Sequence, residues 1–134
     1  MGEKQMKYIL SIDGGSQSTK ATIFDLEGRI IASASKPLKP YDLPGPGLVE
    51  HPGDDLWDSL VAACKKLMDR FEGNPADIAA MGLCSIRFDR VLMKEDGTLA
   101  QPALSWMDIR VSRPYVHDNP AVSHVASTNG YLTA

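Results

Sequence analysis

The sequence of 134 residues has few cysteines, no long apolar run and no excess of basic residues. Its two cysteines, Cys64 and Cys84, lie among apolar residues and are too few for a disulfide framework, so we expect two buried, reduced thiols. Nothing near them has the spacing of metal ligands, which argues against a metal site at the cysteines. Without about 18 consecutive apolar residues or the apolar centre of a signal peptide, neither a membrane span nor secretion is predicted.

The balance of charge is slightly acidic. Fourteen basic and seventeen acidic residues give a formal net charge of −3, and no basic face stands out. We therefore expect a cytoplasmic protein that binds neither nucleic acid nor an anionic membrane. Residues 1–6 precede the first strand pattern and are interpreted as a leader. Residues 7–134 are long enough for one domain that buries about two-thirds of its unfolded surface.

The most informative segment is residues 8–25, where two apolar runs, 8–12 and 21–24, flank a polar turn. This pattern predicts a β-hairpin. Glycines in the turn permit close backbone approach and unusual φ/ψ angles, and successive backbone N–H groups there can form a concavity that binds anions. We predict a divalent cation at Asp13, which ends the first run. The predicted phosphate-binding residues are Gly14, Gly15, Ser16, Gln17, Ser18 and Lys20.

Other phosphate-binding loops fit this segment less well. A Walker A loop needs four residues between its first glycine and Gly-Lys-Ser/Thr, and a dinucleotide-binding loop needs Gly-x-Gly-x-x-Gly followed by a helix. The segment has neither spacing, and a strand follows it. The remaining alternative is an ordinary polar hairpin whose Asp and Ser side chains satisfy turn hydrogen bonds.

Further strands, a loop and a helix are predicted along the chain. Residues 29–35 follow a tight turn and predict a third antiparallel strand. Residues 36–53 contain five prolines and predict an extended loop, either a flap beside a cleft or, as we favour, a simple crossover. His51 in this loop is interpreted as a surface histidine.

A helix is expected from Asp54 or Asp55 to about Arg70. Its apolar stripe consists of Leu56, Trp57, Leu60, Val61, Cys64, Leu67, Met68 and Phe71. We expect Trp57 to be part of the core rather than a ligand platform. Residues 78–84 predict a central strand, residues 88–93 and 104–106 predict short strands, and residues 94–97 predict a hairpin turn. Parallel pairing of the first and fourth strands would place Asp13 and Arg87 at the rim of one cleft.

Three blocks of sequence resemble a known family. Asp-Gly-Gly-Ser-Gln-Ser-Thr-Lys at 13–20 resembles the first phosphate motif of the sugar kinase, hexokinase, Hsp70 and actin superfamily. Residues 47–57 are similar to the Gly-x-x-Glu-x-x-x-x-x-x-Trp motif of the FGGY carbohydrate kinases. Residues 78–110 resemble the segment with that family's Trp-x-Asp-x-Arg signature, here Trp106, Asp108 and Arg110. The resemblance covers roughly residues 7–115.

This resemblance implies an α/β fold, the ribonuclease-H-like domain of actin-like ATPases, with a mixed sheet in the order βββαβ. The chain would be a partial N-terminal kinase domain, incomplete and without the second lobe. The implied reaction transfers the γ-phosphoryl group of ATP to a sugar or polyol with the help of Mg²⁺. The catalytic base is expected beyond Ala134, so no catalytic residue is assigned and the chain alone is expected to be inactive.

The resemblance also assigns sugar contacts to Arg87, Trp106 and Asp108. Because Phe88 stands where glycerol kinases have Glu, glycerol is doubtful as the substrate. From the residues alone, Arg87 could instead be a surface arginine paired with Asp89 or Asp108, and Asp108–Arg110 could be an architectural ion pair. A stand-alone binding or regulatory remnant and another ATPase of the superfamily remain alternatives for the function. A homodimer is also open, because an isolated half-lobe can expose apolar surface.

Overall fold

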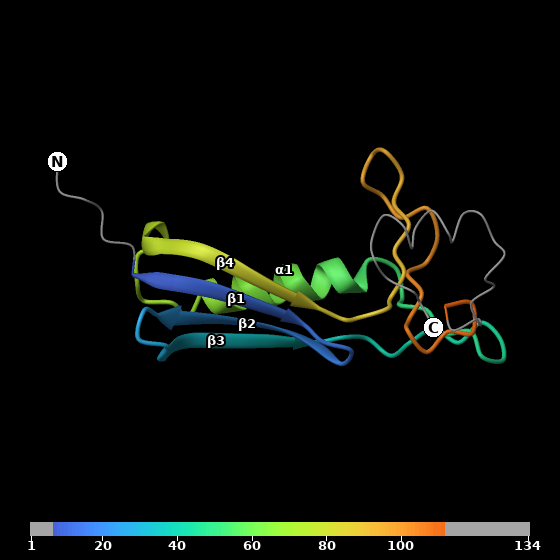
Figure 1. The fold of residues 1–134 in the computed structure, drawn as a ribbon, viewed down its shortest axis with the longest axis horizontal. Coiled ribbons are helices and arrows are strands. Elements are labelled where there is room, and N and C mark those ends of the chain that lie inside the picture. The colour runs from blue at the N-terminus through green and yellow to red at the C-terminus, as the bar shows by residue number, and fades with distance from the viewer. Residues whose placement is uncertain (1–6, 112–134) are drawn as a thin grey trace, which may run out of the picture.

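The computed structural model describes residues 7–111, which form a mixed sheet covered on part of one face by a helix (Figure 1). The elements are β1 (Tyr8–Gly14), β2 (Ser18–Asp25), β3 (Ile30–Pro37), α1 (Asp55–Met68), a 3₁₀ turn (Pro75–Asp77) and β4 (Ile78–Ser85). The strands lie in the order β3-β2-β1-β4, and β1 pairs antiparallel with β2 and parallel with β4. The predicted βββαβ order and mixed sheet are therefore confirmed.

The core lies between α1 and strands β2 and β3. On α1 the buried residues are Asp55, Ser59, Ala63 and Leu67, which recur every four residues. Small side chains in this row let the helix lie close to the sheet. Inside the contact, the hydroxyl groups of Ser59 and Thr19 are 2.7 Å apart and satisfy each other. The core under the helix consists of Ala21, Ile23, Ala34, Ala63, Leu67 and Phe71.

The predicted apolar stripe of α1 is therefore only partly correct. Leu67 and Phe71 are buried, but Trp57 is 66% exposed, so its assignment to the core is wrong. The larger apolar residues Leu56, Leu60, Val61, Cys64 and Met68 flank the contact and are half-buried. Apolar periodicity missed the row that faces the sheet because two of its four members are polar.

Strand β4 lies at the edge of the sheet that residues 7–111 form, so within these residues it is not the central strand that was predicted. Helix α1 packs mainly on β2 and β3, and among residues 7–111 no element pairs with the outer side of β4. As a result Met81 and Leu83 are exposed although they are large and apolar. Cys84 is exposed and Cys64 is half-buried, so the expectation of two buried thiols is also wrong.

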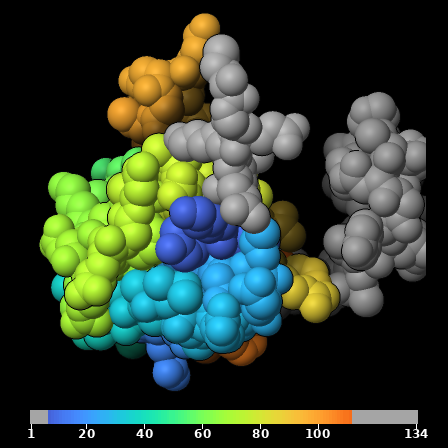
Figure 2. All heavy atoms as spheres, turned by 90° about the vertical axis from the view of Figure 1, so that its left-hand side faces the viewer, coloured from blue at the N-terminus to red at the C-terminus, as the bar shows by residue number. Residues whose placement is uncertain are grey.

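The segment after β4 is irregular. The expected strands at 88–93 and 104–106 are absent from the described residues. Only isolated bridges form there: Leu104 bridges to both Arg90 and Glu50, and Met93 bridges to Leu99. The predicted turn at 94–97 is present, with Gly97 at φ 82°, and this part of the chain projects from the body of the molecule in orange (Figure 2). Residues 38–53 form the expected extended loop. Within residues 7–111, no helix has the length and apolar character that a membrane span requires.

Candidate functional site

The turn between β1 and β2 places polar and charged groups at one end of the sheet. The Gly15 amide donates to the Ser18 carbonyl over 3.0 Å, which closes the turn. The amides of Ser16 and Gln17 donate to no other group among residues 7–111, and both side chains are exposed. Directly behind the turn, Asp13 lies opposite Lys20 in the antiparallel ladder. The backbone amides and the Lys20 ammonium group could thus bind an anion at the turn, and the Asp13 carboxylate lies beside them.

The two glycines of the turn matter because they have no Cβ atom, not because they adopt a positive φ. Neither Gly14 nor Gly15 has a positive φ, so the expected unusual backbone angles are wrong. A Cβ on Gly15 would lie 3.1 Å from the Ser18 carbonyl oxygen, which is tighter than ordinary contact. Glycine therefore lets the turn close tightly. Ser18 and Lys20, predicted as part of the turn region, lie in β2.

Parallel pairing brings the end of β4 beside this turn. Gly14 is paired with Ser85, and Arg87 follows two residues later. Arg87 is exposed, and its guanidinium lies 5.6 Å from the centre of the Phe88 ring. Among residues 7–111 Arg87 forms no ion pair with Asp89 or Asp108, so that alternative is wrong; the two carboxylates bind His51 and Arg110. The common cleft of Asp13 and Arg87 stays a prediction.

The chain changes direction sharply after Arg87. Phe88 has φ 67°, a conformation that is unfavourable for a bulky residue. The next residue, Asp89, has a side chain only 8% exposed and lies 2.8 Å from Nε2 of His51. His51 is 2% exposed, so its assignment to the surface is wrong. No sequence pattern predicted this pair, because 38 residues separate its members.

The other predicted sugar contacts lie in the loop at 106–110. The Trp106 side chain is partly exposed, whereas Asp108 is fully buried. The Asp108 carboxylate accepts hydrogen bonds from the Val49 amide over 2.7 Å and from Nε and Nη2 of Arg110 over 2.8 and 2.7 Å. The Arg110 guanidinium holds the pKa of Asp108 well below its usual range, and Asp108 raises the pKa of Arg110. The architectural ion pair is therefore present, while contact of Asp108 with a sugar stays a prediction.

The proline-rich loop fixes the 106–110 loop from one side. Gly47 has φ 73°, and a Cβ there would lie 2.7 Å from Cγ2 of Ile109, so only glycine fits. The Ile109 amide donates to the Gly47 carbonyl over 3.0 Å. Glu50 accepts from Nη2 of Arg110 over 2.6 Å. Gly47 and Glu50 are the first two specified positions of the Gly-x-x-Glu-x-x-x-x-x-x-Trp motif at 47–57. In this structure both positions of the motif therefore hold the 106–110 loop.

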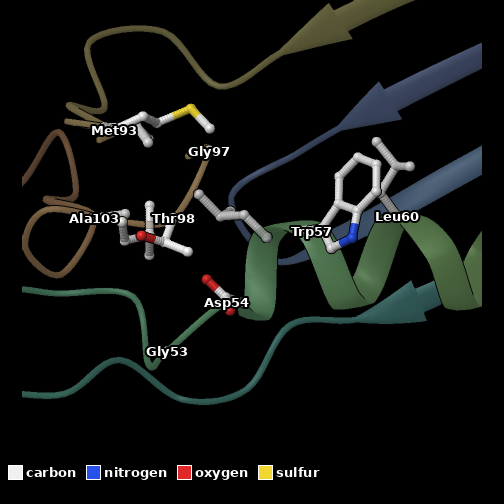
Figure 3. Close-up of a pocket in the computed structure, with 11 residues that line it drawn as sticks. Gly53, Asp54, Trp57, Leu60, Met93, Gly97, Thr98 and Ala103 are labelled. Carbon is white, nitrogen blue, oxygen red and sulfur yellow. The ribbon is translucent and has the colours of Figure 1, made fainter. Parts of the chain in front are cut away.

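A separate groove of about 540 Å³ lies between the start of α1 and the 91–103 segment (Figure 3). Trp57 and Leu60 line it from the helix, and Met93 and Ala103 line it from the opposite segment. Its walls are mostly apolar, and none of the predicted phosphate or sugar contacts lies in it. Trp57 therefore lies in this groove, which includes no residue of the turn at 15–18.

A metal ion would have to be held at the turn by few protein ligands. Within residues 7–111 there is no group of three His, Cys, Asp or Glu side chains that could form a metal centre. Asp13 is an exposed single carboxylate beside the phosphate turn. Mg²⁺ in nucleotide sites is usually bound by one or two carboxylates together with phosphates and water, so these residues fit Mg²⁺ bound to a nucleotide.

Comparison with known proteins assigns the family. The model of the N-terminal domain of the FGGY family of carbohydrate kinases matches residues 8–117. The chain belongs to the FGGY family of carbohydrate kinases. A protein of Escherichia coli (strain K12) described as an uncharacterized sugar kinase, YgcE, is 53% identical over 127 residues, which cover 95% of this chain and 26% of that protein. A glycerol kinase of Thermus brockianus is 34% identical over 80% of this chain and 22% of its own length.

Solved structures of FGGY kinases share the fold. A xylulose kinase from Lactobacillus acidophilus, crystallised with a ligand, superposes with a TM-score of 0.67 at 23% identity, over 92% of this chain and 23% of that one. Glycerol kinase from Plasmodium falciparum with ADP gives a TM-score of 0.65 at 22% identity, over 96% of this chain and 24% of that one. The fold is thus that of the actin-like ATPases. This FGGY chain spans about a quarter of the length of these relatives.

Proposed function

We propose that this chain forms the phosphate side and part of the sugar side of an ATP-dependent carbohydrate kinase, within a longer protein. The reaction would transfer the γ-phosphoryl group of ATP to a hydroxyl of a sugar or polyol. The observation that carries the proposal is the arrangement at the end of β1, where Asp13 lies opposite Lys20 behind the 15–18 turn. Beside it, β4 ends and leads to Arg87.

Phosphoryl transfer asks a protein mainly to position the reactants and to neutralise charge. The amides of Ser16 and Gln17, which have no acceptor among residues 7–111, would donate to phosphate oxygens. Gly14, Gly15 and Ser18 would shape the turn, and Lys20 would add positive charge. Asp13 would hold Mg²⁺, directly or through water, and the bound ion would neutralise phosphate charge. The base that takes the proton of the attacking hydroxyl is proposed to lie beyond Ala134.

Arg87, Trp106 and Asp108 are proposed to face the sugar. The Arg87 guanidinium is exposed and free of ion pairs within residues 7–111, so its donors are available to hydroxyl groups. The partly exposed indole of Trp106 offers an apolar surface for the C–H face of a sugar. The Asp108 carboxylate, which is bound to Arg110, is proposed to lie at the base of this site and to accept hydrogen bonds from sugar hydroxyl groups.

The proposal is tested on the full-length protein with a thermal-shift screen of sugars and polyols, with and without MgATP, followed by turnover assays on each hit. We expect Asp13→Asn to lower kcat at least about 100-fold, because a site for transition-state charge is lost. Asp58→Asn, on the exposed face of α1, is the matched control and should change nothing. Unchanged kcat in Asp13→Asn would contradict the role of Asp13.

The 134-residue chain alone serves as the negative control. Because we place the base beyond Ala134, this chain should show no turnover with any sugar that the full-length protein phosphorylates. Turnover by the short chain would overturn that placement. Binding of sugar or nucleotide by the full-length protein without turnover would instead favour a regulatory remnant.

A further inference from the structure

The Asp89 carboxylate connects three segments that are distant in sequence. Its Oδ1 accepts a hydrogen bond from the Trp106 amide over 2.7 Å, and its Oδ2 lies 2.8 Å from Nε2 of His51. Because a carboxylate accepts, Nε2 of His51 carries the hydrogen in this contact. Hydrogen bonds to a charged acceptor are about twice as strong as those between neutral groups. One side chain thus fixes both the main chain at Trp106 and the imidazole of His51.

His51 is itself held firmly. Its ring packs edge-on against Tyr41, with ring centres 4.9 Å apart. Its backbone amide donates to the Ala103 carbonyl over 2.8 Å, and the Ser105 amide donates to the Val49 carbonyl over 3.0 Å. The end of the proline-rich loop is therefore joined to the chain on the N-terminal side of Trp106. The hydrogen bond from the Trp106 amide to Asp89 adds a third connection to these two, at Trp106 itself.

Asp89 also lies two residues after Arg87, the other proposed sugar contact. Phe88, with its positive φ, lies between them; this conformation is unfavourable for a bulky residue and persists only where its surroundings require it. Here it separates an exposed Arg87 from a nearly buried Asp89. The backbone strain is thus located where one short segment must present Arg87 to solvent and Asp89 to the loop of Trp106.

We propose that Asp89, supported by His51, is a positioning residue that sets the place of Trp106 relative to Arg87 in the sugar site. The proposal rests on the proposed function, because it takes the Trp106 indole as a surface for the sugar. Asp89 acts through the Trp106 backbone and does not itself touch the sugar. Its removal would leave the amide without its acceptor and the imidazole without its partner, and the indole would shift.

The first test is spectroscopic and needs no substrate. The chain has two tryptophans, and Trp57→Phe leaves Trp106 as the only one of the 134-residue chain. In that background Asp89→Ala should reduce the near-UV circular dichroism of Trp106 and raise its quenching by acrylamide about twofold. Asp89→Asn keeps an oxygen that can accept from the Trp106 amide, so it should restore most of the signal. His51→Gln should give an intermediate change.

Asp55→Ala is the matched control. Asp55 is 2% exposed and likewise accepts from one loop amide, that of Lys39, over 2.8 Å. Each variant therefore loses a buried carboxylate that holds a loop, but of the two carboxylates only that of Asp89 binds the Trp106 amide. An unchanged Trp106 spectrum in Asp89→Ala, or an equal change in Asp55→Ala, would overturn the proposal. Should Asp89→Ala not fold, His51→Gln decides by the same comparison with Asp55→Ala: an unchanged Trp106 spectrum, or a change equal to that in Asp55→Ala, would overturn the proposal.

The second test is kinetic and uses the full-length protein. Asp89→Ala should raise KM for the sugar about tenfold, leave kcat within about twofold and leave KM for ATP unchanged, because the lost contact aligns the sugar alone. Asp89→Asn should recover most of the affinity. A KM for the sugar that stays at the wild-type value would overturn the positioning role. A wild-type protein with no sugar kinase activity would instead overturn the proposed function, and the spectra would still decide whether Asp89 places Trp106.

Discussion

Two regions of this chain are held together by different chemistry. The sheet core, made of Ala21, Ile23, Ala34, Ala63, Leu67 and Phe71, is apolar and lies beneath α1. The loop layer, made of residues 47–51, 89–90 and 103–110, is joined by backbone hydrogen bonds and by the carboxylates of Asp89 and Asp108. The first should respond to lost volume and the second to lost charge. The proposed sugar contact at Trp106 lies in the second region, so its geometry depends on ionisable groups.

The largest expected effect is a truncation in the sheet core. Leu67 is fully buried, so Leu67→Ala removes apolar contacts and leaves a cavity. Such a change typically costs about 2–5 kcal/mol of unfolding free energy, whereas Leu67→Met, which keeps the volume, should cost less than about 1.5 kcal/mol. Urea unfolding at neutral pH measures both. A loss below about 1 kcal/mol for Leu67→Ala would contradict the division into two regions.

Acid should act on the loop layer. Hydrogen bonds from Arg110 hold the pKa of Asp108 well below the ordinary value of 3.8. A group whose pKa is lower in the folded state stabilises the fold above its unfolded pKa, and this contribution is lost as the pH falls through the folded pKa. The stabilisation is therefore complete at neutral pH and declines below about pH 4, so the free energy of unfolding should fall there.

The variant Asp108→Asn tests this assignment. It should be less stable than wild type at neutral pH and should lose less further stability between pH 4 and pH 2, because it cannot be protonated in that range. Asp58→Asn, an exposed site on α1, should keep the wild-type pH dependence. The measurement is the free energy of urea unfolding at a series of pH values. If the free energy of unfolding fell equally steeply with pH in Asp108→Asn and wild type, other carboxylates would be the cause of the acid sensitivity.

Sequence reasoning was accurate where structure is local. Alternating and periodic residues located the hairpin, α1 and β4 to within a few residues, and the turn beside Asp13 lay where the glycines indicated. It failed where tertiary contact decides. The face of α1 toward the sheet contains Asp55 and Ser59, which no apolar pattern selects. His51 and Asp89 meet across 38 residues, and such a contact leaves no signal in a single sequence.

The smallest expected effect lies at the boundary of the sheet core. Leu83 is paired with Ile12 across β1 and β4, so both side chains point to the face that carries α1. Ile12 is 4% exposed, but Leu83 is 64% exposed because the helix does not reach β4. Leu83→Ser should therefore change the free energy of unfolding by about 0.5 kcal/mol or less. Ile12→Ala, a truncation on the covered strand, should cost about 2–5 kcal/mol.

Both variants are compared with wild type by urea unfolding at two protein concentrations tenfold apart. If exposure of β4 is the state in solution, Leu83→Ser is neutral at both concentrations. A loss above about 1 kcal/mol only at the higher concentration would show that a second copy of the chain covers β4, because association stabilises the folded state by mass action. A loss independent of concentration would mean that β4 is buried within one chain, and the sheet core would then extend beyond the area under α1.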